Sequence, residues 1–475
     1  MDTIIKENGI TFKELEQKIF SLVCEEGRNY TKQILEMYDS YLRDNRDKKV
    51  YRNKGLRETT IKTVYGEVTY KRTIYQTVDE AGNKIFVYLL DETLEMEKVG
   101  LISTNLAEKL VHGITEMSYR ECASKVTEMT GQSISPMGVW NVIQALGEKV
   151  VEEEKELVEA YKKGNIQGEE TTPVLFEEAD GVYINPQGKD RKKNGKEKAE
   201  MKVALAYEGW KVVGKDRCEL SNKVVVAGFS NAKEFHEYRE AAIAEKYDIN
   251  EIDVRLLNAD GASWIKKVKD KSTHFQLDPF HKYKAIKEKI TDKRAASDIV
   301  ELLDSKQLDE MFEYLDMYSN SVGTEEESEK VQDLIKYFNN NRDGLIPYQE
   351  RDIELPALNE GLEYKNMGTM ENHIWSVIAK RMKHNHTSWS IPGGNHLAKI
   401  LAKKCSGKLH EVTERVKREL FEEEKIEEII EILGAGRIPL KIGKGYESSI
   451  TNVHMPYLSA KVDGGRHTWL SIAGF

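Results

Sequence analysis

The stretch that decides the fold is VLFEEADGVYI, residues 174–184. Apolar residues on both sides of its acids predict a strand that is buried in a sheet. Asp180 lies inside this strand, because Val182 and Ile184 continue the apolar pattern beyond it. A carboxylate in such a place is costly unless it is paired or bound to a cation. An Asp-Gly pair is also an ordinary turn signal, so a turn is the alternative reading.

A second acid, Asp260, ends a buried strand predicted over residues 254–259. It also precedes a glycine, so the same turn alternative applies to it. Three strands close in sequence, followed by strands that alternate with helices, predict a mixed sheet in an α/β layer. The other strands are expected at residues 201–207, 210–213, 224–229 and 273–277, and a helix at 232–246.

A third acid, Glu371, opens a helix predicted over residues 371–383. Thr369 can cap this helix, and an acid in the first turn is favoured by the helix dipole, which is the ordinary explanation for Glu371. Residues 283–359 have an almost wholly helical and charged pattern. We therefore expect a helical insertion between the last strand of the sheet and this closing helix.

Three acids from separate elements are the minimal equipment for phosphoryl transfer with two metal ions. Mg²⁺ takes few protein carboxylates and completes its shell with water and phosphate oxygens. Asp180, Asp260 and Glu371 can supply these ligands to two Mg²⁺ ions, with Mn²⁺ as a substitute, if their strands are neighbours in the sheet. Downstream, Lys380, Arg381, Lys383 and Trp389 place cations beside an aromatic ring, a pattern that suits contact with a DNA backbone.

The first hundred residues predict an amphipathic helix over residues 12–46, for packing or dimerisation, and a β-hairpin within residues 57–87. Residues 101–148 predict a helix-turn-helix. Ser118 and Glu121 form a capping-box pattern, and Ser135 precedes a proline at the first turn of the next helix. That second helix has an expected apolar face of Val139, Trp140, Ile143 and Leu146. It is poor in Arg and Lys, so a purely structural helical hairpin is the alternative.

Composition limits the classes of protein. The net charge of −10 means that any DNA contact must come from local basic patches. The chain has no apolar run long enough to span a membrane and no signal-peptide pattern at its start, so we expect a cytoplasmic protein. Its four cysteines lack paired spacing, which argues against a zinc knuckle or a disulfide framework.

These motifs resemble those of the ISLre group of bacterial insertion-sequence transposases. The matching stretches are residues 178–182 (EADGV), 258–264 (NADGASW), 368–372 (GTMEN), 381–383 (RMK) and 388–390 (SWS). The resemblance runs from near residue 12 to near residue 470. It implies a DDE enzyme with an RNase H-like core, in which Asp180, Asp260 and Glu371 form the catalytic triad.

A further match is residues 278–281 (DPFH), which is similar to a (Cys/Asp)-x-x-His pair of related transposase groups. The resemblance implies that Asp278 and His281 support the metal ligands or contact the DNA end. The ordinary alternative is an Asp N-cap, with proline at the first helical turn and an incidental histidine.

The resulting expectation is an α/β protein with an RNase H-like mixed sheet, a helical insertion, and an N-terminal DNA-binding region. The expected segments are 1–100, 101–150, 170–282, 283–360, 361–390 and 391–475. Its partners would be double-stranded DNA, at element ends and target, and further copies of itself, in the nucleoid. A metal-dependent nuclease of the same fold and a non-catalytic DNA-binding regulator are the main alternatives. A hydrolase built on His274, Asp278, His281 and His373 lacks tight ligand spacing.

Overall fold

The computed structural model describes residues 11–79, 81–94, 102–193, 198–215, 217–266, 273–383 and 387–414. Contacts divide the chain into two compact units, Met1–Arg418 and Glu419–Phe475. The second unit, and with it the expected tail after residue 434, lies outside the described residues. Among the helices of the described part, none combines the length and the apolar run that a membrane crossing requires.

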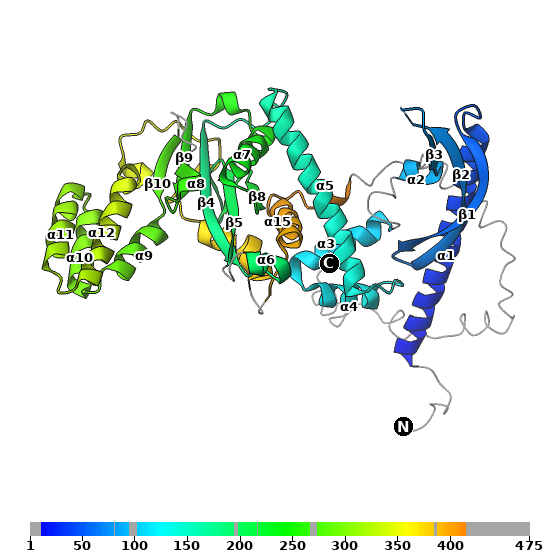
Figure 1. Cartoon of the computed structure of the whole chain (residues 1–475), viewed down its shortest axis with the longest axis horizontal. Coiled ribbons are helices and arrows are strands. Elements are labelled where there is room, and N and C mark those ends of the chain that lie inside the picture. The colour runs from blue at the N-terminus through cyan, green and yellow to red at the C-terminus, as the bar shows by residue number, and fades with distance from the viewer. Residues whose placement is uncertain are drawn as a thin grey trace, which may run out of the picture. The chain divides into compact units, whose positions relative to one another are not determined.

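A five-stranded sheet lies at the centre of the first unit (Figure 1). Its strand order is β10-β9-β4-β5-β8. The antiparallel pairs are β4–β5 and β5–β8, and the parallel pairs are β4–β9 and β9–β10. The predicted mixed α/β sheet is confirmed. The strands are β4 (Val174–Ile184), β5 (Ala199–Tyr207), β8 (Val224–Gly228), β9 (Val254–Ala259) and β10 (Thr273–Leu277).

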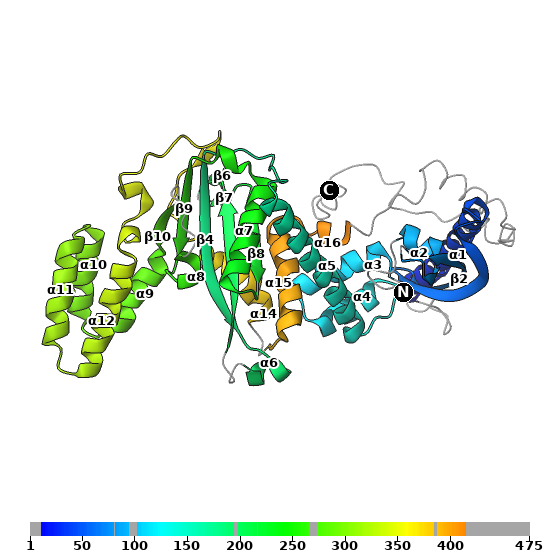
Figure 2. The same cartoon turned by 45° about the horizontal axis from the view of Figure 1, so that its top comes forward.

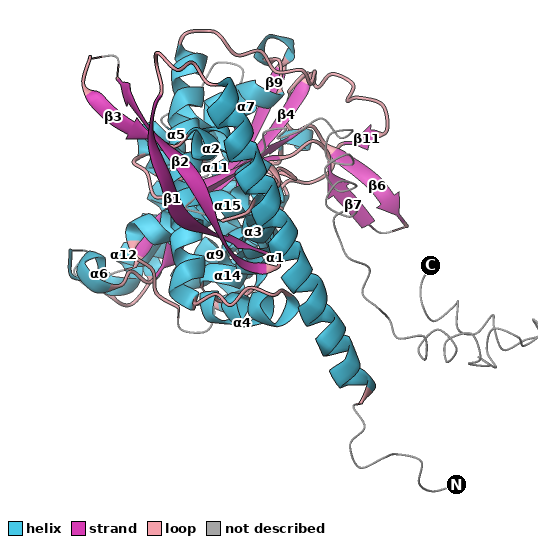
Figure 3. Ribbon diagram, turned by 90° about the vertical axis from the view of Figure 1, so that its right-hand side faces the viewer, coloured by secondary structure: helices cyan, strands magenta, loops and turns pink. Residues whose placement is uncertain are grey.

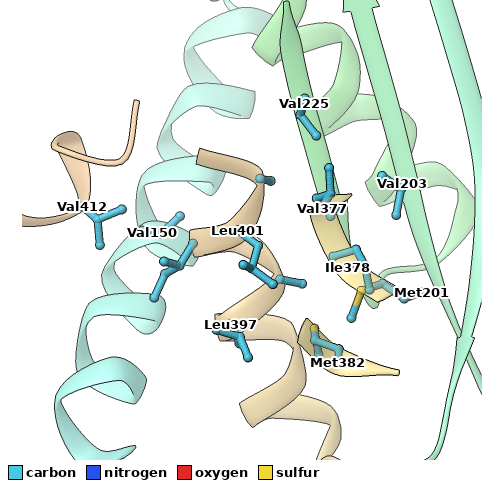
Figure 4. Close-up of a cluster of buried hydrophobic side chains, with 14 of the residues drawn as sticks. Val150, Met201, Val203, Val225, Val377, Ile378, Met382, Leu397, Leu401 and Val412 are labelled. Carbon is cyan, nitrogen blue, oxygen red and sulfur yellow. The ribbon is translucent and has the colours of Figure 1, made fainter. Parts of the chain in front are cut away.

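Helices cover both faces of this sheet because alternate strand residues point to opposite sides (Figure 2). On one side, Ala179 and Leu257 pack in a cluster with Phe235 of α7 (Ala232–Lys246). On the other side lie α15 (Ile391–Cys405) and the closing helix. The closing helix comprises α13 (Met370–Ile374), a π-helical turn η5 (Trp375–Ala379) and α14 (Lys380–Met382). Its residues Val377, Ile378 and Met382 pack with Met201, Val203, Leu397 and Leu401 (Figure 4).

The insertion before the closing helix is helical, as the sequence predicts. Its helices are α9 (Pro279–Lys289), α10 (Lys293–Asp304), α11 (Leu308–Ser321) and α12 (Glu325–Asn340). The helical pattern ends earlier than expected, because residues 353–358 form neither helix nor strand and a turn then leads into β11 (Leu362–Glu363). That short strand joins β6 (Trp210–Gly214) and β7 (Arg217–Leu220) in a second sheet.

The N-terminal region pairs a long helix with a three-stranded sheet (Figure 3). The predicted helix and hairpin are confirmed as α1 (Phe12–Asn45) and the pair β1 (Arg52–Thr63) and β2 (Gly66–Val78), to which β3 (Lys84–Val87) adds. Helix α2 (Leu89–Leu94) follows. The first turns of α1 are exposed throughout, including their large apolar residues Phe12, Leu15, Ile19, Phe20, Leu22 and Val23.

The next helices are α3 (Thr104–Glu116), α4 (Tyr119–Met129) and α5 (Pro136–Lys162). Ser118 and Ser135 cap α4 and α5 as predicted. Helix α5 is longer than expected, because it continues through the predicted link to the sheet and packs along α7 and α15. The expected apolar face is wrong at Trp140, which is 38 % exposed while Val139 and Ile143 are buried. Trp140 follows Val139 by one residue, about 100° around the helix, and so leaves the buried stripe. A helix-turn-helix function for α4 and α5 stays a prediction.

Helix α16 (Glu411–Glu414) ends the described part. The helical region expected from residue 395 to 432 is therefore described only as far as residue 414. The segment boundaries given above stay predictions.

Candidate active site

The register of the central sheet brings Asp180, Asp260 and Asp278 to the same height along neighbouring strands. Ala179 of β4 pairs with Ala259 of β9, and Ala259 pairs with Leu277 of β10. Each of these paired residues is followed by an acid. Asp180 lies within β4, and Asp260 and Asp278 directly follow the last residues of β9 and β10. Because the strands run parallel, the acids lie side by side at the same edge of the sheet. Asp180 and Asp260 are 80 residues apart in the sequence, so their proximity depends on the pairing of the strands.

A cavity of about 170 Å³ opens at this row. All three acids that the sequence proposes as metal ligands line it, although they come from a strand, a strand end and a helix. The acidic and basic side chains around it are those of Asp180, Asp260, Asp278, His281, Glu371 and Lys383. The structure therefore gathers the proposed triad, while the catalytic role of these acids stays a prediction.

Asp180 is the most perturbed carboxylate of the cavity. Burial raises its pKa to about 6, and the charges of Asp260 and Asp278 act in the same direction. His281 and the backbone N–H of Gly181, 2.6 Å from Asp180 Oδ1, oppose this rise. An acid in this surrounding favours either a proton or a bound cation.

Asp278 and His281 form a hydrogen-bonded pair in the same cavity. Asp278 Oδ2 lies 3.2 Å from His281 Nδ1 and accepts from the backbone N–H of His281, also at 3.2 Å. Asn258 Nδ2 donates to Asp278 Oδ1 at 2.8 Å. Burial favours a raised pKa for Asp278, but these hydrogen bonds outweigh it and hold the pKa below its usual range. The N-cap reading of Asp278 is confirmed, since it caps α9 with Pro279 in the first turn.

Glu371 lies in the first turn of α13 and is exposed at the rim of the cavity. Thr369 stands at the expected start of this helix, where its backbone C=O accepts from the N–H of His373 at 3.1 Å, but its hydroxyl has another partner. The hydroxyl of Thr369 donates to Glu178 Oε1 at 2.8 Å, and the backbone N–H of Met370 donates to Glu178 Oε2 at 2.9 Å. The fully buried carboxylate of Glu178 needs donors, and it takes them from the start of this helix.

Two of the four expected DNA contacts are contradicted by their burial. Arg381 is 9 % exposed, its Nε donates to Ile114 O at 2.8 Å, and its guanidinium lies over the rings of Tyr119 and Trp389. Trp389 is 8 % exposed, and its Nε1 donates to Met382 O at 2.9 Å. Both side chains hold the closing helix inside the protein, so in this conformation they cannot reach DNA.

The two lysines remain candidates. Lys383 is exposed and lines the cavity. Lys380 is also exposed, but its Nζ pairs with Glu116 at 3.0 Å. His384 and His386, which follow them in sequence, lie outside the described residues.

Sequence reasoning missed several residues of the site. Tyr183 and Phe280 line the cavity and are 52 % and 47 % exposed, so their rings are available to stack on a base. Asn258 is buried in β9 and holds Asp278. A polar side chain inside an apolar strand was the available signal for Asn258, whereas the exposure of the two rings depends on tertiary packing.

The chemistry of the cavity fits a hard divalent cation. Its carboxylate oxygens are the ligands that Mg²⁺ prefers, and a cation would offset the clustered negative charge around Asp180. The side chains do not form a complete site for a single ion, because no group of three or more His, Cys, Asp or Glu in the described part is placed to hold one. Mg²⁺ needs only one or two protein carboxylates when water and phosphate complete its shell. Asp180, Asp260 and Glu371 are the residues that could supply them.

Comparisons with known proteins give a family but no activity. The model of an uncharacterised protein family, UPF0236, matches residues 5–419. UPF0236 protein TTE2489 of Caldanaerobacter subterraneus subsp. tengcongensis is 25% identical over 421 residues, which are 85% of this chain and 81% of that protein. A relative in the same organism, whose name joins eleven designations from TTE0033 to TTE2212, is 25% identical over 423 residues, 86% of this chain and 80% of its own. The UPF0236 protein in the vanSb 3′ region of Streptococcus gallolyticus is 24% identical over 419 residues, 85% of this chain and 87% of its own.

Proposed function

We propose that this chain, which belongs to the UPF0236 family of uncharacterised proteins, is a DNA transposase that cuts and joins phosphodiesters with divalent metal ions. One observation carries the proposal. Asp180, Asp260 and Glu371, which are far apart in the sequence, line a single cavity at the edge of the central sheet. Acids that converge in this way suit the binding of metal ions at a phosphodiester.

The fold supports the same proposal. An RNase H-like core has a sheet in which three antiparallel strands are followed by two parallel ones, and the order β8-β5-β4-β9-β10 is compatible with this arrangement. Helices α10 to α12 lie between the last strand, β10, and the helix that carries Glu371. This is where the sequence pattern predicts a helical insertion.

The names of the relatives add independent support. Three relatives from Caldanaerobacter subterraneus subsp. tengcongensis have names that each join several designations. One name joins eleven designations, another four and the third two. A protein that recurs under many designations is expected when its coding DNA moves or is copied. A housekeeping nuclease or a regulator gives no reason for such recurrence.

The proposed mechanism assigns roles to side chains of the cavity. Asp180, Asp260 and Glu371 would hold two Mg²⁺ ions, with Mn²⁺ as a substitute, and none would act as a nucleophile. When bound, these ions would neutralise phosphate charge and lower the pKa of the attacking water or 3′-hydroxyl. Lys383, exposed at the same cavity, would contact a phosphate of the DNA.

The remaining groups would position the DNA end. Asp278 orients His281 through Nδ1 and leaves Nε2 for the substrate. Water would first cleave at the element end, and the released 3′-hydroxyl would then attack target DNA in the same cavity. Positioning and charge neutralisation carry both steps, so no covalent protein–DNA intermediate is needed.

The partners in this proposal are double-stranded DNA and further copies of the chain. Helices α4 and α5 would bind the element ends, with the start of α5 facing DNA. Met137 and Trp140 are exposed there. The exposed apolar residues at the start of α1 support self-association on DNA, since a contiguous apolar face in water favours a partner.

The test uses the DNA that flanks the coding sequence of this protein. The purified chain is incubated with that DNA and Mg²⁺, and products are mapped at nucleotide resolution. We expect nicks with 3′-hydroxyl ends at the borders of the element and joined products in added target DNA, both abolished by EDTA. Cleavage without any joining would favour the nuclease alternative. Absence of cleavage with both Mg²⁺ and Mn²⁺ would contradict the proposal.

A further inference from the structure

We infer that Glu178 is a positioning residue that sets Glu371 against Asp180; this inference rests on the proposed function. Glu178 is fully buried, with 0 % of its surface exposed. It is absent from the lining of the cavity, so it does not reach the proposed metal ions itself. Its action must therefore pass through the residues that it holds.

Three donors converge on its carboxylate. The hydroxyls of Tyr207 and Thr369 donate to Oε1, both at 2.8 Å, and the backbone N–H of Met370 donates to Oε2 at 2.9 Å. Met370 is the neighbour of Glu371, and its N–H is one of the groups that a helix leaves unsatisfied at its start. Glu178 thus binds the closing helix one residue before the proposed metal ligand.

Glu178 lies on the same strand as the proposed ligand Asp180. Glu178 and Asp180 are two residues apart on one strand, so their side chains leave the same face of the sheet. One strand therefore supplies the proposed ligand Asp180 and the anchor for the second ligand Glu371. A shift of the closing helix along the sheet would break the hydrogen bonds of Glu178 to Thr369 and Met370.

The start of the closing helix has two unusual backbone features. Helix α13 has five residues before the chain changes to the π-helical turn η5. Gly368, two residues ahead of it, has φ +121, a conformation that other residues rarely adopt.

Glu177 provides a matched control on the opposite face of the same strand. It is also buried, and its carboxylate pairs with Arg255 at 2.7 Å and with Arg239 at 3.5 Å. Its partners lie away from the cavity. Loss of Glu177 should therefore cost stability without moving Glu371.

The experiment compares Glu178→Ala, Glu178→Gln and Glu177→Ala in cleavage and in Mn²⁺ titrations. We expect Glu178→Ala to weaken Mn²⁺ binding and cleavage by roughly 10- to 100-fold, as loss of a group that orients a metal ligand does. Glu177→Ala should lower the melting temperature but keep both activities within about threefold when values are expressed per folded molecule.

Glu178→Gln should rescue function, because an amide can replace the carboxylate here. Its oxygen can accept from Met370 N–H, while its NH₂ donates to the hydroxyls of Tyr207 and Thr369, which can also accept. If Glu178→Gln were as inactive as Glu371→Gln, Glu178 would be a metal ligand and the inference would be wrong. It would equally be wrong if Glu178→Ala behaved like Glu177→Ala.

Two further variants cover the case in which Glu178→Ala does not fold. Thr369→Val and Tyr207→Phe each remove one donor and keep the carboxylate. Thr369→Val, which removes one of the two hydrogen bonds between Glu178 and the start of the closing helix, should weaken Mn²⁺ binding more than Tyr207→Phe, which removes neither. Equal effects would count against the inference. If instead the variants of Asp180, Asp260 and Glu371 all kept cleavage and Mn²⁺ binding, the proposed function itself would fail, whatever Glu178 does.

Discussion

The cavity acids and the cations of the closing helix meet opposite surroundings in this protein. Asp180 lies among other acids, whose charges add to burial in raising its pKa to about 6. Arg381, by contrast, lies between aromatic rings and donates to a backbone carbonyl, and Lys380 pairs with Glu116. Arg381 and Lys380 thus contact groups of neighbouring helices, whereas the acids near Asp180 repel its charge. Repulsion between these acids is unfavourable for folding, and a bound cation would offset it.

The largest expected effect comes from the acids. Asp180→Ala, Asp260→Ala and Glu371→Ala should each reduce DNA cleavage on the order of 10³-fold. Each variant would lose a ligand of the metal ions that stabilise the negative charge of the transition state. DNA affinity should change only a few-fold, since phosphate contacts supply it. Glu354→Ala, which removes an exposed acid outside the cavity, is the control. Normal cleavage by any of the three variants would remove that residue from the site.

Arg381→Ala tests whether the buried cation of the closing helix stabilises the fold and does not bind DNA. The change removes a buried cation, its hydrogen bond to Ile114 and its contacts with two rings. The free energy of unfolding should fall by about 2–4 kcal/mol, measured by urea unfolding. DNA affinity per folded molecule should stay within about threefold of the parent value. A stable Arg381→Ala protein that has lost DNA binding would restore the sequence prediction that the structure contradicts.

Asp180→Asn tests the electrostatic cost of the cavity. The pKa of Asp180 in the folded protein is about 6, above the value of about 3.9 in an unfolded chain, so the folded state holds a proton more tightly. The parent protein therefore loses stability as the pH rises from about 4 to about 6, and the loss is complete above that range. Without metal, Asp180→Asn should be more stable than the parent by up to about 3 kcal/mol at pH 7.5 and equal to it below pH 4. Urea unfolding in EDTA at both pH values checks this, and an unchanged or lower stability at pH 7.5 would contradict it.

The smallest effect is expected for Lys380→Ala. Its ion pair with Glu116 spans 3.0 Å between side chains that are about half exposed. Such pairs contribute on the order of 0–1 kcal/mol, so the melting temperature should barely change. Lys383→Ala should also leave stability unchanged but weaken DNA binding in a salt-dependent way. Equal DNA affinities of these two variants and the parent would remove Lys383 from the proposed interface.

The sequence was informative where an element carries its own signal. Helix α1, the β1–β2 hairpin and the caps Ser118 and Ser135 follow from local periodicity and capping chemistry. Asp180 could be selected because an acid inside an apolar strand lacks a local explanation. The pairing of Ala179 with Ala259, which brings the acids together, is a long-range property that a local pattern does not contain.

The errors have the same origin. Arg381 looked like a surface cation because its partner, Ile114, lies 267 residues away. Thr369 was expected to cap the closing helix with its side chain, but its hydroxyl donates to the buried carboxylate of Glu178. In both cases a tertiary contact decides what the side chain does, whereas its neighbours in the sequence suggest a different role.

A titration of metal-free protein with Mn²⁺, followed by the electron paramagnetic resonance of the free ion, tests the central claim most directly. The account predicts that the parent chain binds Mn²⁺ and that Asp180→Asn, Asp260→Asn and Glu371→Gln each weaken this binding at least about tenfold. Glu354→Gln should leave it unchanged. Equal Mn²⁺ binding by the parent and all three cavity variants would show that these acids do not hold metal.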